Sequence, residues 1–165
     1  MKKHHFIAFI LFCLGIYYSS FILSAPTSRP QLPQVSDLRV VAQQAKVQKL
    51  PILLMFGTDE CPFCQLLRED FLIPMIISGD YTDKIILREI HISARENIID
   101  FSGHSIPVSR FAQHHHVSLF PTMVFIDSSG QALVKPIVGI TTPSLFGGTL
   151  DEQIDRALEK LRQAL

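Results

Sequence analysis

Two of the three cysteines lie in the segment Cys61-Pro62-Phe63-Cys64, immediately after the apolar run 51–56. Where a buried strand ends and a helix begins, this spacing exposes the first sulfur and buries the second one helical turn later. An exposed thiolate at a helix start attacks disulfides, and a second thiol nearby resolves the mixed disulfide that forms. The segment therefore predicts thiol–disulfide exchange, with Cys61 as the attacking sulfur and Cys64 as the resolving sulfur.

A purely structural disulfide and a zinc site are the alternative interpretations of this pair. A disulfide between residues this close in sequence closes a very small loop, and the stabilisation from chain entropy grows with loop length. Zinc normally takes four ligands, often from two such pairs, and the sequence contains no second pair. The remaining cysteine, Cys13, lies in an N-terminal apolar segment. Reactivity is therefore the better explanation of the pair.

The histidines leave a second function open, that of a copper or zinc carrier using the cysteine pair and a histidine. His114, His115 and His116 are consecutive, and His91 and His104 lie elsewhere in the chain. Side chains of consecutive helical residues point about 100° apart, so three of them do not converge on one ion. A solvated helix end, with imidazoles near the last carbonyl groups, is the favoured interpretation. No metal ligands are predicted.

Two acidic residues directly before the first cysteine bear on the direction of electron flow. A helix dipole favours a thiolate by about 0.3–1 kcal/mol, whereas a carboxylate roughly 5 Å away in water disfavours it by about 0.8 kcal/mol. Asp59 and Glu60 would therefore offset much of the dipole if they point toward Cys61, and no histidine lies between the cysteines. We expect a reductant or general exchanger rather than a strong oxidant, whose reduced form must be stabilised.

Residues 1–25 have the pattern of an export signal. Lys2 and Lys3 precede an unbroken apolar stretch, Phe6–Leu14, and a more polar end. The alternative is an uncleaved anchor, because residues 6–23 are mostly apolar and their length is near the lower limit for crossing a bilayer. In either case we expect the rest of the chain to be periplasmic or otherwise extracytoplasmic, and in the second case anchored in the inner membrane.

The remaining sequence predicts a short linker and one globular domain. Residues 26–35, with Pro26, Pro30 and Pro33, are expected to form the linker, and residues 36–165 a single domain. Apolar residues make up 47% of the sequence and charged residues 18%, which indicates a packed core. After residue 25 there remain 13 basic and 15 acidic residues without a basic patch, so no nucleic-acid partner is expected. No cofactor is predicted.

Hydrophobic periodicity and turn residues predict the elements around the cysteines. A helix over 37–48 is expected to be capped by Ser36, and the helix that begins at the cysteines is expected to kink at Pro74. The capping box Thr149-x-x-Glu152 is expected to begin the final helix. The expected strands are 52–56, 85–92, 120–126 and 131–138, with an irregular insertion at 95–105, a helix over 107–115 and a hairpin turn at 127–130. Pro136 in the last strand indicates a sheet edge.

The chain resembles the thioredoxin superfamily, and within it the secreted bacterial branch with a Cys-Pro-aromatic-Cys centre. The resemblance spans roughly residues 36–165 and rests on two motifs at the right separation. The matching segments are Phe56-Gly57-Thr58-Asp59-Glu60-Cys61-Pro62-Phe63-Cys64, Phe120-Pro121-Thr122, Phe125-Ile126-Asp127 with Gly130, and Gly139. The resemblance implies an α/β thioredoxin fold, in which a mixed central sheet of about four to five strands is flanked by helices.

The same resemblance implies roles for residues other than the cysteines. Pro121 would be a cis-proline that faces the cysteine pair and receives the substrate backbone, and Phe120, Pro62 and Phe63 would add substrate contacts. Protein thiols and disulfides would be the substrates, and a membrane-bound electron donor or acceptor would be a partner. Where cytoplasmic-type members have a buried acid, this chain has Met55. Proton removal from the resolving thiol then needs another base or water.

Overall fold

A computed structural model describes residues 30–92 and 96–164 of this chain. The export signal or anchor predicted over residues 1–25 lies outside the described residues, and so does Arg95, the first residue of the expected insertion. In the part of the chain that is described, no helix has both the length and the apolar character needed to cross a bilayer.

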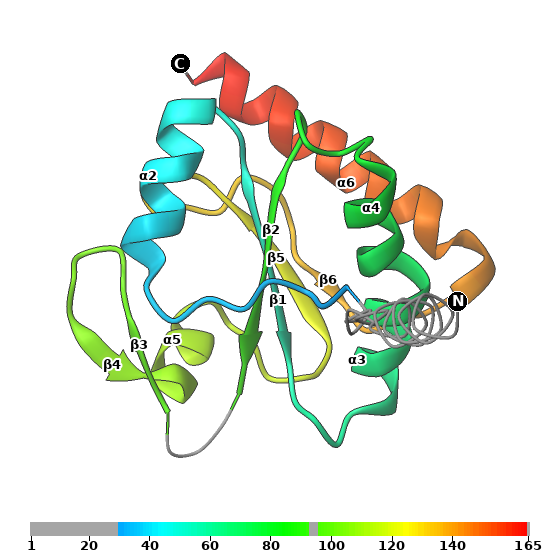
Figure 1. The fold of residues 1–165 in the computed structure, drawn as a ribbon, viewed down its shortest axis with the longest axis horizontal. Coiled ribbons are helices and arrows are strands. Elements are labelled where there is room, and N and C mark those ends of the chain that lie inside the picture. The colour runs from blue at the N-terminus through cyan, green and yellow to red at the C-terminus, as the bar shows by residue number, and fades with distance from the viewer. Residues whose placement is uncertain (1–29, 93–95, 165) are drawn as a thin grey trace, which may run out of the picture.

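A mixed four-stranded sheet forms the centre of the fold, with the strand order β2-β1-β5-β6 (Figure 1). Its strands are β1 (Ile52–Gly57), β2 (Ile86–His91), β5 (Thr122–Ile126) and β6 (Ile137–Val138). β1 pairs in parallel with β2 and antiparallel with β5, which pairs antiparallel with β6. Every residue of β1 is buried, because both faces of the sheet are covered, and this explains its unbroken apolar sequence. The mixed sheet expected from the sequence is confirmed.

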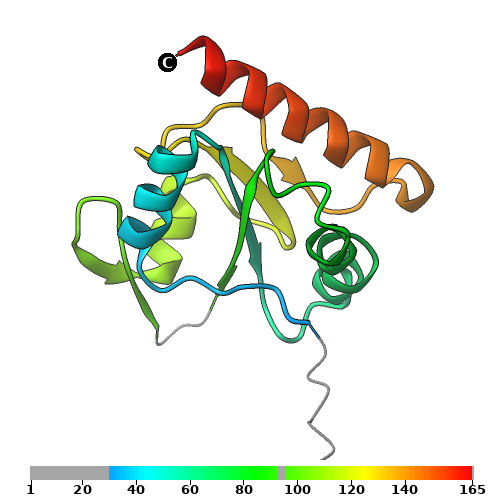
Figure 2. The same cartoon turned by 45° about the horizontal axis from the view of Figure 1, so that its top comes forward.

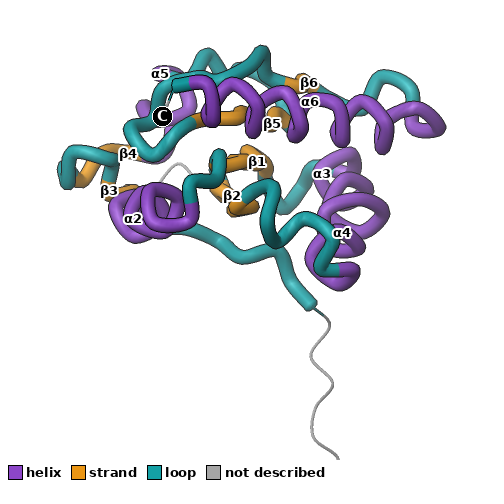
Figure 3. The backbone as a smooth tube through the Cα atoms, turned by 90° about the horizontal axis from the view of Figure 1, so that it is seen from above, coloured by secondary structure: helices purple, strands orange, loops and turns teal. Residues whose placement is uncertain are grey.

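Helices cover both faces of this sheet (Figures 1 and 3). They are α2 (Leu38–Gln48), α3 (Pro62–Leu67), α4 (Ile73–Ser78), α5 (Val108–His114) and α6 (Pro143–Gln163). One apolar cluster lies between the sheet and α2 with α5, and the other lies between the sheet and α3, α4 and α6. Residues of β1 alternate between the clusters, so Met55 shares a cluster with Cys64 whereas Phe56 does not.

The helical segment that carries the cysteines contains a five-residue π turn, Arg68–Leu72, between α3 and α4. In this turn the N–H of Ile73 donates to the Arg68 carbonyl, five residues back. Pro74 has no N–H, and its ring crowds the carbonyl four residues earlier. The wider turn lies where the α-helical hydrogen bonds would be interrupted. The irregularity expected at Pro74 therefore takes the form of a π turn directly before it.

Residues 30–35, the second half of the expected linker, form an extended segment packed on the domain (Figure 2). Leu32 is buried. The N–H of Glu89 donates to the Pro33 carbonyl at 2.8 Å, and the Glu89 carbonyl accepts the Val35 N–H at 3.0 Å. Because β2 is an edge strand, this segment covers part of its open edge. The packed part of the chain thus begins earlier than the expected boundary.

The N-cap of α2 is Asp37 rather than the predicted Ser36. The Asp37 carboxylate accepts a hydrogen bond from the backbone N–H of Arg39 at 3.0 Å. It accepts another from Nη2 of the Arg39 side chain at 2.7 Å. The arginine holds the pKa of Asp37 below its usual value. A charged carboxylate at this position is the better cap because it also interacts favourably with the helix dipole.

The final helix, α6, begins at Pro143, so the predicted start at the Thr149-x-x-Glu152 capping box is wrong. Both residues lie inside the helix, and the Thr149 hydroxyl donates back to the Leu145 carbonyl at 3.3 Å. A proline at the first helical position supplies the helical backbone angle and lacks an N–H that would have no partner there. The earlier start follows from this preference.

The insertion expected to be irregular contains a β-hairpin, in which β3 (Asn97–Ile99) pairs antiparallel with β4 (Ser105–Pro107). Ile98 is buried in the cluster beneath α2 and α5. The carboxylate of Asp100 orders the turn by accepting the N–H of His104 at 2.8 Å. The prediction of an irregular segment is therefore wrong, because a turn closed by a side chain and a buried isoleucine hold the hairpin in place.

The last strand is shorter than the strand predicted over residues 131–138. Only Ile137–Val138 pair with β5 as a strand, and Ala132 forms an isolated bridge with Ile126. Pro136 has no N–H to donate to a neighbouring strand, which limits the pairing. β6 lies at the edge of the sheet, as the proline indicated.

Candidate active site

Cys61 and Cys64 form a disulfide at the start of α3, with their Cα atoms 5.1 Å apart. Cys61 is the N-cap of α3, and Cys64 lies one turn further into the helix. Cys64 is completely buried, whereas Cys61 is partly exposed. The accessible sulfur is thus the one that the sequence assigns as the attacking sulfur, while the roles themselves stay predictions.

The start of α3 favours a negative charge on the first sulfur. The N–H of Cys64 donates to Cys61 Sγ at 3.1 Å. Pro62, at the beginning of the helix, has no N–H. The N–H that points at this sulfur and the helix dipole favour an anion at this end. Once the disulfide is reduced, Cys61 is the sulfur that its position favours as a thiolate.

Phe120 and Pro121 lie at the same end of the sheet as the cysteines. β5 runs antiparallel to β1, with Thr122 as the partner of Phe56, so Pro121 enters the sheet where β1 leaves it toward Cys61. The Phe120–Pro121 peptide bond is cis, as the resemblance implied. That Pro121 faces the cysteine pair and receives the substrate backbone stays a prediction. Pro121 is buried.

Large apolar side chains are exposed on the segments next to this end of the sheet. Phe63 is 58% exposed, Leu119 63% and Phe120 36%, and Pro62 is exposed as well. Exposed apolar side chains beside a reactive sulfur are suited to contact an extended substrate chain. The substrate-binding roles of Pro62, Phe63 and Phe120 stay predictions. Leu119 was not predicted, although its place directly before Phe120-Pro121 is a usable signal.

Asp59 and Glu60 are both exposed on the loop between β1 and α3. Oδ1 of Asp59 lies 3.2 Å from Nε2 of His91, the last residue of β2. The two atoms are close enough for an ion pair, but the ring nitrogen is not aligned for a hydrogen bond. Asp59 therefore faces His91, a neighbour that the sequence did not reveal. The effect of the two carboxylates on Cys61 stays a prediction.

Residues 38–154 match the family model of the thioredoxin-like domain. The match covers more than half of the chain and includes both cysteines and the cis-proline. The chain belongs to the thioredoxin-like domain family. Family, fold and the disulfide-bonded pair together make this thioredoxin-like protein a thiol–disulfide oxidoreductase, with protein thiols and disulfides as its substrates. No match is found among curated protein sequences.

Several solved structures are similar to this chain at low sequence identity. Thioredoxin O2 of Arabidopsis thaliana in its oxidised state has a TM-score of 0.50 and 19% identity, over 76% of this chain and 96% of that one. Thioredoxin of Fasciola hepatica has a TM-score of 0.49 and 15% identity, over 76% and 99%. A thioredoxin-fold protein of Helicobacter pylori has a TM-score of 0.48 and 20% identity, over 68% and 83%. The first of these confirms the thioredoxin fold predicted from the sequence.

A buried ion pair between the cysteine-bearing helical segment and β2 of this thioredoxin-like domain was not predicted. Glu89 of β2 is only 3% exposed, and Nε of Arg68 donates to its carboxylate at 2.7 Å. A signal was present, because Arg88-Glu89 interrupts an apolar strand and buried carboxylates are rare unless they are paired. The partner of Glu89 could not be read from spacing, since it lies on a different element.

The histidines of the described residues do not gather into an ion site. His114 ends α5, and His115 follows as its C-cap, half-buried beside Phe111. The prediction that these histidines lie at a solvated helix end is therefore confirmed for His114 and His116, which are exposed. It is wrong for His115, which is half-buried. Within residues 30–92 and 96–164, no group of three or more His, Cys, Asp or Glu side chains is placed to hold a metal ion.

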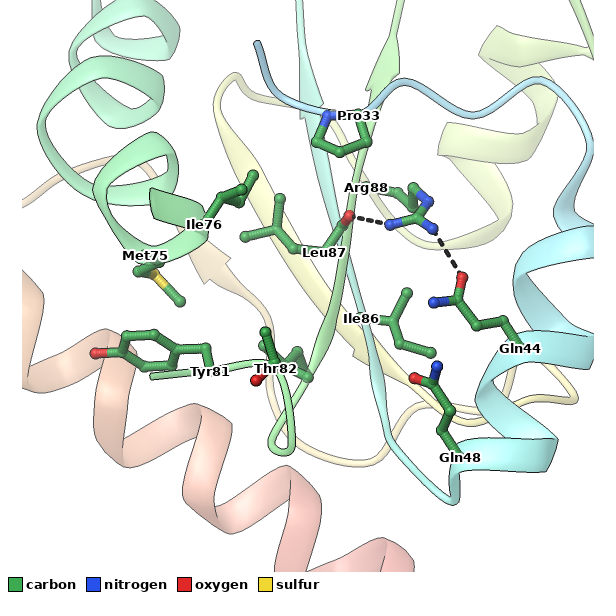
Figure 4. A pocket seen from close by; sticks show the side chains of 11 residues that line it. Pro33, Gln44, Gln48, Met75, Ile76, Tyr81, Thr82, Ile86, Leu87 and Arg88 are labelled. Carbon is green, nitrogen blue, oxygen red and sulfur yellow. Dashed lines mark hydrogen bonds between the residues drawn. The ribbon is translucent and has the colours of Figure 1, made fainter. Parts of the chain in front are cut away.

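A separate cavity of about 310 Å³ opens along β2, between α2 and α4 (Figure 4). Met75, Ile76 and Leu87 line one side of it. From the other side, Arg88 donates to the Gln44 side-chain oxygen at 2.8 Å and to the Leu87 carbonyl at 2.7 Å. Neither cysteine lines this cavity, so it is not part of the redox site.

Proposed function

We propose that this protein is an extracytoplasmic reductant of protein disulfides, with Cys61 as the attacking sulfur and Cys64 as the resolving sulfur. The observation that carries the proposal is a partly exposed Cys61 at a helix N-cap, bonded to a fully buried Cys64 one turn inside. This arrangement opens one sulfur to a substrate and keeps the other from solvent until a mixed disulfide has formed.

The reaction follows from the order in which the sulfurs become accessible. The Cys61 thiolate attacks one sulfur of a substrate disulfide, forms a mixed disulfide with it and releases the other substrate sulfur as a thiolate. The Cys64 thiol then loses its proton and attacks the Cys61 sulfur, which releases the second substrate sulfur and closes the Cys61–Cys64 disulfide. Two electrons and two protons pass from the enzyme dithiol to the substrate, which leaves as a dithiol.

Two exposed carboxylates support the reducing direction. Asp59 and Glu60 lie on the loop that leads to Cys61. In water, a carboxylate roughly 5 Å from a sulfur disfavours its thiolate by about 0.8 kcal/mol. A strong oxidant needs a stabilised thiolate in its reduced form. A site with two carboxylates and no cationic residue between its cysteines is better suited to donate electrons.

The proposed location is supported by residues 1–25, which lie outside the described part of the chain. Their charged start and apolar stretch are typical of an export signal. Outside the cytoplasm the enzyme needs re-reduction after each cycle, and we assign that step to a membrane-bound electron donor. Expression of the full chain in a bacterium, followed by cell fractionation and N-terminal sequencing, tests the location. Recovery of an uncleaved chain from the cytosol would overturn it.

The function is tested by reduction of a protein disulfide and by the reduction potential of the Cys61–Cys64 couple. We expect catalytic reduction in the presence of a small dithiol, with no catalysis by Cys61→Ser. We also expect a potential nearer to about −270 mV, as for thioredoxin, than to about −120 mV, as for a strong oxidant. A potential near the second value would overturn the direction only. A wild-type protein without any exchange activity would overturn the function.

A further inference from the structure

Arg68 and Glu89 form a buried ion pair between the cysteine-bearing helical segment and β2. Nε of Arg68 donates to Glu89 Oε1 at 2.7 Å, and the two side chains are 19% and 4% exposed. Moving two charges out of water costs more free energy than their attraction regains, unless further hydrogen bonds complete the pair. A buried ion pair is therefore weak support for a role in stability. Its position relative to the sulfurs indicates a different role.

Arg68 connects three parts of the redox site. Its backbone N–H donates to the carbonyl of Cys64, one turn earlier in the helix. Its Nη2 atom donates to the carbonyl of Thr58 at 3.1 Å, in the loop that leads from β1 to Cys61. Its Nε atom is held by Glu89 on β2. The Arg68 side chain thus bonds the loop and the sheet to the helical segment that carries the cysteines.

Glu89 lies on the same face of the sheet as the buried sulfur. It is the register partner of Met55 on β1, and register partners on neighbouring strands point to the same face. Met55 and Cys64 belong to one apolar cluster. Charges in apolar surroundings are screened less than exposed charges. Both charges of the ion pair are therefore expected to act on Cys64 more strongly than a surface charge does.

We propose that Arg68 is the positioning residue of the redox pair and that Glu89 balances its charge. Arg68 holds the Thr58 loop and the helical turn of Cys64 at a fixed spacing, so that Cys64 stays aligned with Cys61 after the disulfide opens. The guanidinium favours a thiolate at Cys64, and the carboxylate opposes it. This inference rests on the exchange reaction proposed for the two cysteines. It states that the Arg68–Glu89 ion pair controls how readily the resolving thiol, Cys64, loses its proton.

The test measures the thiol pKa values of the reduced protein by thiolate absorbance in single and double variants. Glu89→Gln leaves the guanidinium without a counter-charge, so the Cys64 pKa should fall by about one unit, a tenfold change in ionisation. Arg68→Gln leaves the carboxylate alone, so the same pKa should rise by a similar amount. The double variant should return close to the wild-type value. If the ion pair were only a structural contact, its loss would shift the Cys64 pKa in the same direction in both single variants.

Arg68→Lys separates positioning from charge. Lysine keeps the positive charge but lacks the planar fork that serves Glu89 and Thr58 together. We expect the thiol pKa to stay near that of the wild type, while closure of the mixed disulfide slows by about tenfold. Asp155→Asn is the control, because it removes one partner of the exposed Lys84–Asp155 pair, whose atoms lie 2.9 Å apart. Asp155→Asn should change neither the thiol pKa nor the rate at which the mixed disulfide is resolved.

The outcomes separate this inference from the proposed function. Shifts of equal sign in Glu89→Gln and Arg68→Gln, or no shift in either, would overturn the inference while leaving wild-type exchange activity untouched. If circular dichroism shows that Arg68→Gln is unfolded, Glu89→Gln decides alone, and an unchanged or raised thiol pKa there refutes the inference. A wild-type protein with opposite shifts in its variants but no exchange activity would refute the proposed function instead.

Discussion

The imidazole of His115 lies edge-on against the ring of Phe111, with the ring centroids 4.6 Å apart. The ring of Phe56 lies 6.3 Å from the same imidazole, centroid to centroid. Burial among these side chains lowers the pKa of His115 from 6.5 to about 4, and the charges of His114 and His116 add to the effect. The folded protein therefore keeps a neutral imidazole at a pH where the unfolded chain binds a proton.

This difference predicts a loss of stability in mild acid. The contribution of a neutral His115 is intact above the unfolded pKa of 6.5 and is lost as the pH falls toward about 4, because only the unfolded chain takes up the proton in that range. Allowing for the partial exposure of the ring, we expect the free energy of unfolding to fall by about 1 kcal/mol between pH 7 and pH 5 from this group. Urea unfolding of His115→Gln should show a correspondingly smaller loss. His114→Gln, on the exposed side of the same turn, removes only one of the smaller causes of the lowered His115 pKa, so it should reduce the pH dependence less than His115→Gln does. Identical losses in all three proteins would contradict the prediction.

Gly57 packs directly against the buried sulfur. A Cβ atom added to Gly57 would lie 3.3 Å from Cys64 Sγ and 3.0 Å from Met55 Cε. Both neighbours must shift to admit it, so Gly57→Ala should lower the free energy of unfolding by about 1–3 kcal/mol. It should also slow closure of the disulfide, because Cys64 is displaced. Both effects are measured on purified protein, by urea unfolding and by the rate at which the reduced pair is reoxidised.

Gly148 provides the matched control for this substitution. It lies inside α6, and an added Cβ atom there meets nothing within 4 Å. Gly148→Ala should therefore stabilise the protein by about 0.4–1 kcal/mol through the reduced freedom of the unfolded chain, and leave disulfide closure unchanged. Similar behaviour of Gly57→Ala and Gly148→Ala would mean that the strand tolerates a side chain beside the sulfur.

The two cysteine variants should differ in kind. Cys64→Ser keeps the accessible Cys61 but has no resolving thiol, so it should accumulate a mixed disulfide with a protein substrate, visible as a reducible conjugate in non-reducing electrophoresis. Of the redox pair, Cys61→Ser leaves only the fully buried Cys64 sulfur, so it should form little or no conjugate. If Cys61→Ser trapped substrate and Cys64→Ser did not, the assignment of the two roles would have to be reversed.

Neutralising the carboxylates before the first cysteine should make the couple more oxidising. In Asp59→Asn/Glu60→Gln, the loss of two negative charges near Cys61 should lower its thiol pKa by about one unit at low ionic strength. The shift should shrink at ~1 M salt, where exposed charges are screened within about 3 Å. Glu69→Gln, which removes an exposed charge further along the same helical segment, is the control. An unchanged thiol pKa in the double variant would remove the physical basis for a reductant.

The local features of this protein could be predicted from the sequence. The Cys61–Cys64 spacing and the strand before it each depend on residues that are adjacent or nearly so. Backbone preferences and the hydrophobic period of a strand act over this range, so a single sequence carries them. Where local signals compete, they are less reliable. The Thr149 capping signal was outweighed by a proline at the true helix start.

The tertiary structure alone decided which charged side chains meet one another near the cysteine-bearing segment. Arg68 and Glu89 are 21 residues apart in sequence, and they meet only because the cysteine-bearing helical segment packs against the face of the sheet on which Glu89 lies. The same holds for Asp59, which reaches His91 because the ends of β1 and β2 lie side by side. The hydrophobic period shows which face of an element is buried, but it does not show which residue of another element lies opposite. That depends on strand register and helix packing, which arise only when the whole chain has folded.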